Sequence, residues 1–284
     1  MHNQKQNKGG WLAASIYSHF SLWVRSLRTI LMLIFILLTA YMLARSTEAS
    51  MAAKEYQVHL GETLFCYANR GFNILVTSVA LMVMMSELPK RVAYQNYIIM
   101  RLSRVKWLIS QIVFLVVIVF AFVVLMLVFS ALFSLSFVSP GSGWSDLERL
   151  AADSNYAHLP QIVDQYIRGW HPVAACALAS LILYLFWLTL VFLLLLFSLY
   201  GVPNFGLVFC VSMPMLGILI LYESVGIKVP SHFSTLAAIQ LQVMEHKFQY
   251  IGKVIVGYVA IDVLLVVLMV IRVKQMDVRF IEKE

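Results

Sequence analysis

Charged side chains are scarce in this sequence. Only 12% of the 284 residues are Asp, Glu, Lys or Arg, and 61% are hydrophobic, whereas a soluble domain carries about 25% charged residues. A chain of this composition cannot cover a compact globule with polar side chains, so lipid is the expected solvent for most of its surface. The net charge of +7 then indicates membrane orientation rather than nucleic-acid binding, because the basic residues lie in short segments between apolar runs.

Cysteine is scarce too. Two of the three cysteines, Cys176 and Cys210, lie inside apolar runs. Together with Cys66 they have the spacing of neither a disulfide framework nor a metal site. We therefore expect small buried side chains at these positions.

Catalytic motifs are missing as well. Gly252-Lys253 lacks the upstream glycine and the hydroxyl residue of a phosphate-binding loop, and no H-E-x-x-H or G-x-S-x-G pattern occurs. The seven histidines all lie outside the apolar runs. We predict that the chain is not an enzyme and holds no metal or cofactor of its own.

Long apolar runs are what the sequence has in abundance. A membrane-spanning helix needs about 20 predominantly apolar residues, and we predict an all-α membrane protein with six spans. They are expected at about residues 29–45, 70–86, 107–138, 173–200, 205–222 and 251–271. The first is short, and snorkelling of Arg28 and Arg45 completes it. The fifth contains Pro214, which is expected to kink it.

The segments around the spans are polar or amphipathic. Residues 1–10 form a polar tail, and residues 11–28 resemble an amphipathic helix lying in the membrane interface; the alternative is an extension of the first span into the cytoplasm. A signal peptide is a rival interpretation of this region, but the leader is long and aromatic. Residues 230–249 form an outer helical segment whose depth stays open, and residues 272–284 form a charged tail. We treat residues 29–271 as one transmembrane domain.

The basic residues predict the orientation. With six spans, the side that holds both termini carries 13 Lys and Arg and the other side 8. Since cytoplasmic loops are enriched in Lys and Arg, we expect both termini and the segment 87–106 to be cytoplasmic.

The segment 87–106 lies between the second and third spans and carries five cations against one acid. Pro89 suits the first position of a helix, and residues 90–100 contain no glycine or proline. Tyr94 and Tyr97 lie on roughly one face of this helix, with Arg91 and Arg101 beside them. Orientation explains the cations but not the tyrosines or the helical length. We therefore predict a short helix that docks on a cytoplasmic partner.

Asp262 is the exception among the apolar spans, since it lies within YVAIDVLLVV. A carboxylate at this depth is costly and is a functional-site hypothesis by default. It would act in a substrate cavity or in proton coupling, or it would form a hydrogen bond to a neighbouring helix or to a second copy of the chain. Gln111 and Asn73 are polar residues of other spans that are candidates to meet it.

These features together resemble the ABC-2 type permease subunits of ABC transporters. In that family the second cytoplasmic segment commonly starts with an acid and ends in a Ser-Arg step, and here Glu87 and Ser103-Arg104 stand at matching places, followed by Lys106-Trp107. Arg101 departs from the family, in which a proline is common at that place.

The resemblance implies an exporter-like (type V) topology in the cytoplasmic membrane of a bacterium, with the chain as a multi-pass permease. A separate cytoplasmic ATP-binding subunit would bind ATP and Mg²⁺ and dock on residues 87–106, and a second, identical or homologous permease would complete the pathway. Tyr200–Asn204 would form a minor second contact. The docking residues would be Glu87, Pro89, Arg91, Tyr94, Tyr97, Arg101, Ser103 and Arg104. The alternative is a secondary transporter or channel-like protein that uses Asp262.

Overall fold

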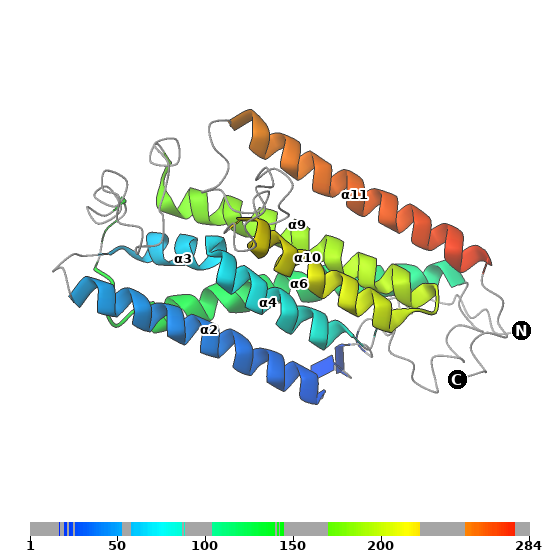
Figure 1. Ribbon diagram of the computed structural model, residues 1–284, viewed down its shortest axis with the longest axis horizontal. Helices are drawn as coiled ribbons and strands as arrows, with labels where there is room; N and C mark the ends of the chain where they lie inside the picture. The colour runs from blue at the N-terminus through cyan, green and yellow to red at the C-terminus, as the bar shows by residue number, and fades with distance from the viewer. Residues whose placement is uncertain are drawn as a thin grey trace, which may run out of the picture.

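The computed structural model describes residues 17, 20–21, 23–24, 26–52, 58–86, 88, 104–139, 141, 143–144, 170–221 and 248–275. Within these ranges the chain is all-helical, with seven helices and no named strand (Figure 1), which confirms the predicted fold class at this level. The helices are α2 (Leu27–Ala52), α3 (Leu60–Asn69), α4 (Gly71–Met85), α6 (Arg104–Ser134), α9 (Pro172–Leu199), α10 (Pro203–Leu221) and α11 (Phe248–Gln275).

The helices lie side by side along the long axis of the molecule, and α2 and α6 begin at the end of the bundle where α4 and α11 finish (Figure 1). Four segments are long and apolar enough to cross a membrane: Leu27–Arg45, Arg104–Ser134, Pro172–Leu199 and Ile251–Gln275. Helices α4 and α10 are apolar but shorter, and α10 continues past Pro214. These are the features of a multi-pass all-α membrane protein.

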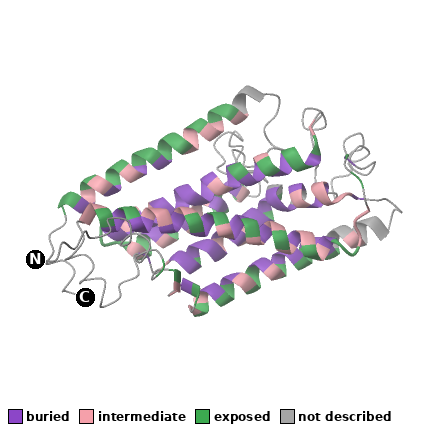
Figure 2. Cartoon of the chain, turned by 180° about the vertical axis from the view of Figure 1, so that it is seen from behind, coloured by how far each residue is buried: buried purple, intermediate pink, exposed green. Residues whose placement is uncertain are grey.

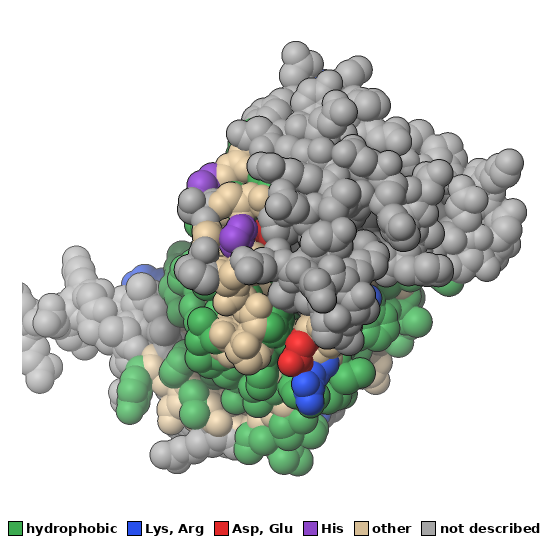
Figure 3. All heavy atoms as spheres, turned by 90° about the vertical axis from the view of Figure 1, so that its left-hand side faces the viewer, with side chains coloured by type: hydrophobic (Ala, Val, Ile, Leu, Met, Phe, Trp, Pro, Cys, Tyr) green, Lys and Arg blue, Asp and Glu red, His purple; other side chains and the backbone are tan. Residues whose placement is uncertain are grey.

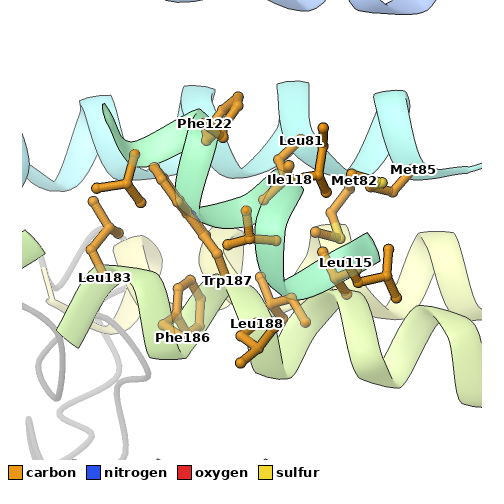
Figure 4. Packing of buried hydrophobic residues seen from close by; sticks show 14 of the residues in the cluster. Leu81, Met82, Met85, Leu115, Ile118, Phe122, Leu183, Phe186, Trp187 and Leu188 are labelled. Atoms are coloured by element: carbon orange, nitrogen blue, oxygen red, sulfur yellow. The ribbon is translucent and has the colours of Figure 1, made fainter. Parts of the chain in front are cut away.

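Helix α9 is the centre of the bundle. It packs against α3, α4, α6, α10 and α11. Of the residues in its apolar stretch, 72% are buried. Trp187 lies in the middle of this core (Figure 4), where its ring meets the edge of Phe122 at a centroid distance of 4.8 Å. Its indole N–H donates a hydrogen bond of 2.8 Å to Ser78 Oγ. Helices α4, α6 and α9 are therefore joined at one point.

The second apolar run is broken, which the sequence analysis did not predict. Helix α4 begins at Gly71 because Arg70 is extended, with φ −77° and ψ 121°. Residues 60–69, which lie between the first two predicted spans, form the helix α3. The Glu62 side chain accepts a hydrogen bond of 3.1 Å from the His59 backbone N–H, as in a capping box. Phe65 is fully buried, so packing against α6 and α9 stabilises this short helix.

Two other helices are longer than the spans predicted from sequence. Helix α2 continues to Ala52 rather than 45, and the exposed pair Arg45–Glu48, 2.7 Å apart, supports its extra turns. Helix α11 continues to Gln275 rather than 271. Its last turn contains Arg272 and Lys274, and cations are favourable near the C-terminus of a helix.

The connection between α9 and α10 is a tight turn. Gly201 has φ +82°, and its N–H donates to the Ser198 carbonyl while the Val202 N–H donates to the Phe197 carbonyl. This is a Schellman motif, which needs a left-handed residue where Gly201 stands. This motif explains why α10 runs straight back along α9.

Gly206 allows α10 to approach α9 closely. A Cβ at this position would lie 2.6 Å from Phe197 Cβ, and an atom at the root of a side chain cannot swing away. We expect Gly206→Ala to lower the free energy of unfolding by about 1–3 kcal/mol through overpacking, measured by thermal unfolding in detergent. Gly257→Ala is the matched control, because a Cβ there meets nothing within 4 Å. Equal stabilities of the two variants would contradict the close approach.

Candidate functional site

One end of the bundle is basic. The starts of α2 and α6 and the last turn of α11 lie there, and among the described residues every charged side chain at this end is a cation. These are Arg28, Arg104, Lys106, Arg272 and Lys274. The opposite end, seen in Figure 3, carries described charges of both signs and histidine, including the pair Arg45–Glu48. The asymmetry agrees in sign with the Lys and Arg counts of the whole sequence.

The residues on both sides of the predicted docking segment lie at this basic end. Arg104 is the first residue of α6, whereas seven of the predicted docking residues lie outside the described residues. These are Glu87, Pro89, Arg91, Tyr94, Tyr97, Arg101 and Ser103. On the near side Leu88 is buried, and its carbonyl accepts a hydrogen bond of 2.6 Å from Ser198 Oγ. On the far side Trp107 is buried. Both flanks of the segment are therefore held by the bundle.

The turn between α9 and α10 lies at the same end and contacts α11. The Arg272 guanidinium lies over the ring of Tyr200 at 4.6 Å and donates to the Leu199 carbonyl at 3.3 Å. A cation–π contact of this kind contributes about 0.5–1 kcal/mol at an exposed site. Three parts of the chain thus meet at one surface: the flanks of residues 89–103, the turn at Tyr200 and the end of α11.

Asp262 is buried between α11 and α9, with 7% of its surface exposed. Its Oδ1 accepts a hydrogen bond of 2.7 Å from the Thr189 hydroxyl, while its Oδ2 is buried without a hydrogen-bond partner. The same hydroxyl is 3.0 Å from the Leu185 carbonyl. Since a hydroxyl has one proton, the carboxylate and the carbonyl share it. The carboxylate is therefore incompletely satisfied.

The hydrogen-bond partner of Asp262 is Thr189, which was not among the residues predicted to meet it. Asn73 of α4 and Gln111 of α6 are both buried, but no described hydrogen bond joins either of them to Asp262, and Asn73 Nδ2 has no hydrogen-bond partner. Thr189 stands alone within LFWLTLVFLLLL, and an isolated hydroxyl in an apolar run is the one signal that pointed to it. The intramembrane polar residues are therefore separate groups.

The break between α3 and α4 places a cation beside an apolar span. Tyr67, three residues before Arg70, shares a hydrogen bond of 2.8 Å with Thr39, which lies inside the apolar segment of α2. Arg70 itself is exposed. Irregular backbone at membrane depth is found where it lines a cavity or is buried in protein, so the break is a second candidate functional feature.

At the end opposite the basic surface, described connections of the chain contact one another. The Ser139 N–H donates to the Val58 carbonyl at 3.1 Å, and the Trp144 indole N–H donates to the Trp170 carbonyl at 2.7 Å. Gly141 lies so close to the His59 ring that a Cβ there would be 2.0 Å from it.

The described part of the chain contains no group of three or more His, Cys, Asp or Glu side chains that could hold a metal ion. Cys176 and Cys210 are free and buried, as expected of small core residues.

No family model, curated protein or solved structure matches this chain. The class that the fold defines is a multi-pass all-α membrane protein, with four helices long and apolar enough to span the bilayer. The finer assignment therefore rests on the residues themselves.

Proposed function

We propose that this chain is the membrane-spanning permease subunit of an ATP-driven ABC transporter of the ABC-2 type, with export as its direction. Its six spans would be α2, α3 with α4, α6, α9, α10 and α11. One observation supports this proposal best: the basic end brings the two held flanks of segment 89–103 together with the Tyr200 turn. A docking segment must be anchored on both sides if a push on it is to move the spans.

The mechanism would convert closure of a partner into altered access. A cytoplasmic ATP-binding subunit, with ATP and Mg²⁺ bound to it, would receive residues 87–106. Its closure would displace the flanks at Leu88 and Trp107, and α4 and α6 would move with them because both flanks are packed in the bundle. The contacts at the opposite end would then have to open for a substrate to leave.

A second permease subunit would complete the pathway. Helix α11 offers an apolar face for such a contact, because only 17% of the residues in its apolar stretch are buried. Most of this helix is exposed or half-buried (Figure 2). Val256, Val263 and Leu264 are among its most exposed side chains. Lipid would cover whatever part of this face the second subunit leaves open.

The test is co-purification of the tagged chain from its source cells. We expect it to bring with it a soluble protein that contains a phosphate-binding loop and hydrolyses ATP. Replacing Tyr94 and Tyr97 together by alanine should lower the recovered ATP-binding subunit at least tenfold, since aromatic anchors at interfaces contribute about 2 kcal/mol or more. Tyr17→Ala is the control, because Tyr17 is 76% exposed and lies outside the docking segment. Recovery of no such subunit, or unchanged recovery with the double variant, would refute the proposal.

A secondary transporter is the second candidate, and two observations favour it. The second apolar run is broken at Arg70, and Asp262 has a buried oxygen without a partner. Broken helices and intramembrane ionisable groups are both common in secondary transporters. Substrate uptake into proteoliposomes driven by an ion gradient, with no ATP-binding subunit present, would select this candidate over the first.

A further inference from the structure

An apolar groove runs between α2 and α4 near the basic end of the bundle, with a volume of about 320 Å³. Its α2 wall includes Leu31 and Phe35, and its α4 wall includes Val76, Val79 and Val83. Leu31, Phe35 and Val83 are each more than 40% exposed. We call this feature the α2–α4 groove.

The dimensions of the groove suit one hydrocarbon chain. From Arg28 to Phe35 the wall rises by about 10 Å, at about 1.5 Å per residue. One leaflet contributes about 15 Å of the hydrocarbon thickness of about 30 Å. A groove of this length would run through much of the depth of a single leaflet.

The groove has a cation at one end. Arg28 lines it there and donates a hydrogen bond to Ser86 Oγ, whose own hydroxyl donates to the Val83 carbonyl. A guanidinium has five N–H donors and matches phosphate geometry. The described charges at this end of the bundle are all basic, and in the sequence the segment 87–106 that follows α4 carries five cations against the single acid Glu87. The balance of charge near this end therefore favours an anionic group.

We propose that the α2–α4 groove binds an anionic phospholipid, with one acyl chain between Phe35 and Val79 and the phosphate at Arg28. An apolar trough that ends in a cation has the polarity of an amphiphile with a negative head. A second copy of the chain fits less well, because a stable protein interface buries more than about 1,000 Å² and the groove is narrow. This site is independent of whether transport is driven by ATP or by an ion gradient.

The orientation of the chain agrees with this occupant. The basic end is the side that the Lys and Arg counts place in the cytoplasm, and the cytoplasmic leaflet is the anionic one. A lipid held there would cover the joint between α2 and α4, close to the flank of the docking segment at Leu88.

Native mass spectrometry of the purified full chain tests the site. Phosphatidylglycerol and phosphatidylcholine with identical acyl chains are supplied in equal amounts. We expect the wild type to retain one phosphatidylglycerol at least five times more often than phosphatidylcholine. In Arg28→Gln this ratio should fall about fivefold. Val76→Phe fills the trough and should lower retention of both lipids at least fivefold. Lys253→Gln, near the start of α11 at the opposite end of the bundle, and Val128→Phe are the matched controls and should behave as the wild type.

Each of the following results would overturn the site. The wild type could retain both lipids equally, Arg28→Gln could keep the preference, or Val76→Phe could keep wild-type occupancy. Should Arg28→Gln fail to give monodisperse protein, the wild-type preference and Val76→Phe each remain sufficient to refute it. Retention of no lipid by a monodisperse wild type would exclude a lipid and leave the α2–α4 groove to a protein segment.

Discussion

Replacing Trp187 by alanine is expected to lower the free energy of unfolding by about 3–5 kcal/mol. Trp187 has no exposed surface and joins α9 to α6 through Phe122 and to α4 through Ser78. Lipid tails are as apolar as a protein core, so much of the loss comes from packing contacts that the cavity no longer makes. Titration with a denaturing detergent, followed by tryptophan fluorescence and proteolysis, measures the change.

Two variants separate packing from hydrogen bonding at this point. Trp187→Phe keeps most of the ring and loses the N–H, so we expect a smaller loss than with alanine. Ser78→Ala leaves the buried indole N–H without its acceptor at a cost of about 1–3 kcal/mol. If Trp187→Phe were as destabilising as Trp187→Ala, the hydrogen bond rather than the packing would be the main contribution.

Asp262→Leu is expected to raise the free energy of unfolding by about 1–3 kcal/mol, which is the cost of a buried polar group left without a hydrogen-bond partner. Asp262 Oδ2 has no partner to offset its burial. Thr189 does not become unsatisfied in the variant, because the Leu185 carbonyl lies 3.0 Å from its hydroxyl. The same detergent titration measures the gain. The stability of Asp262→Asn should fall between those of the wild type and Asp262→Leu, since asparagine keeps an acceptor for Thr189 and removes the charge.

Transport assays on the same variants decide what Asp262 does. A more stable protein with at least tenfold slower transport would assign the carboxylate to the transport path, because activity is often lost where a destabilising residue is replaced. A more stable protein with unchanged transport and assembly would remove it from the functional residues. A less stable Asp262→Leu variant would contradict the view that its charge is incompletely satisfied, and Thr189→Val then tests the hydrogen bond alone.

The anomaly at Asp262 was visible in the sequence, but its partner was not. An acid in an apolar run is rare enough to be recognised by itself, whereas the side chain that meets it depends on how α11 is rotated and shifted against α9. Asn73 and Gln111 were reasonable candidates by polarity and lie on other helices. The docking segment shows the reverse situation: its residues were predicted one by one, and the structure describes only its flanks and Arg104.

Helix α3 shows that a segment outside the predicted spans can still be a packed helix. Residues 60–69 lie between the first two predicted spans and contain Gly61, Glu62 and Asn69. Phe65 and Tyr67 nevertheless are buried, because α9 begins beside them and offers an apolar surface to pack on. The stabilising surface comes from a segment more than 100 residues away in the chain.

The sequence by itself predicted a membrane protein and located the long apolar helices, because both depend on composition and run length alone. The positions of the cations between those runs likewise pointed to the basic end. Only the tertiary structure decided which sides of those helices are buried. Helices α6 and α9 are apolar on all sides, so their hydrophobic pattern has no period that distinguishes a protein-facing side from a lipid-facing one. The central place of α9, the Asp262–Thr189 pair and the α2–α4 groove all follow from packing between helices.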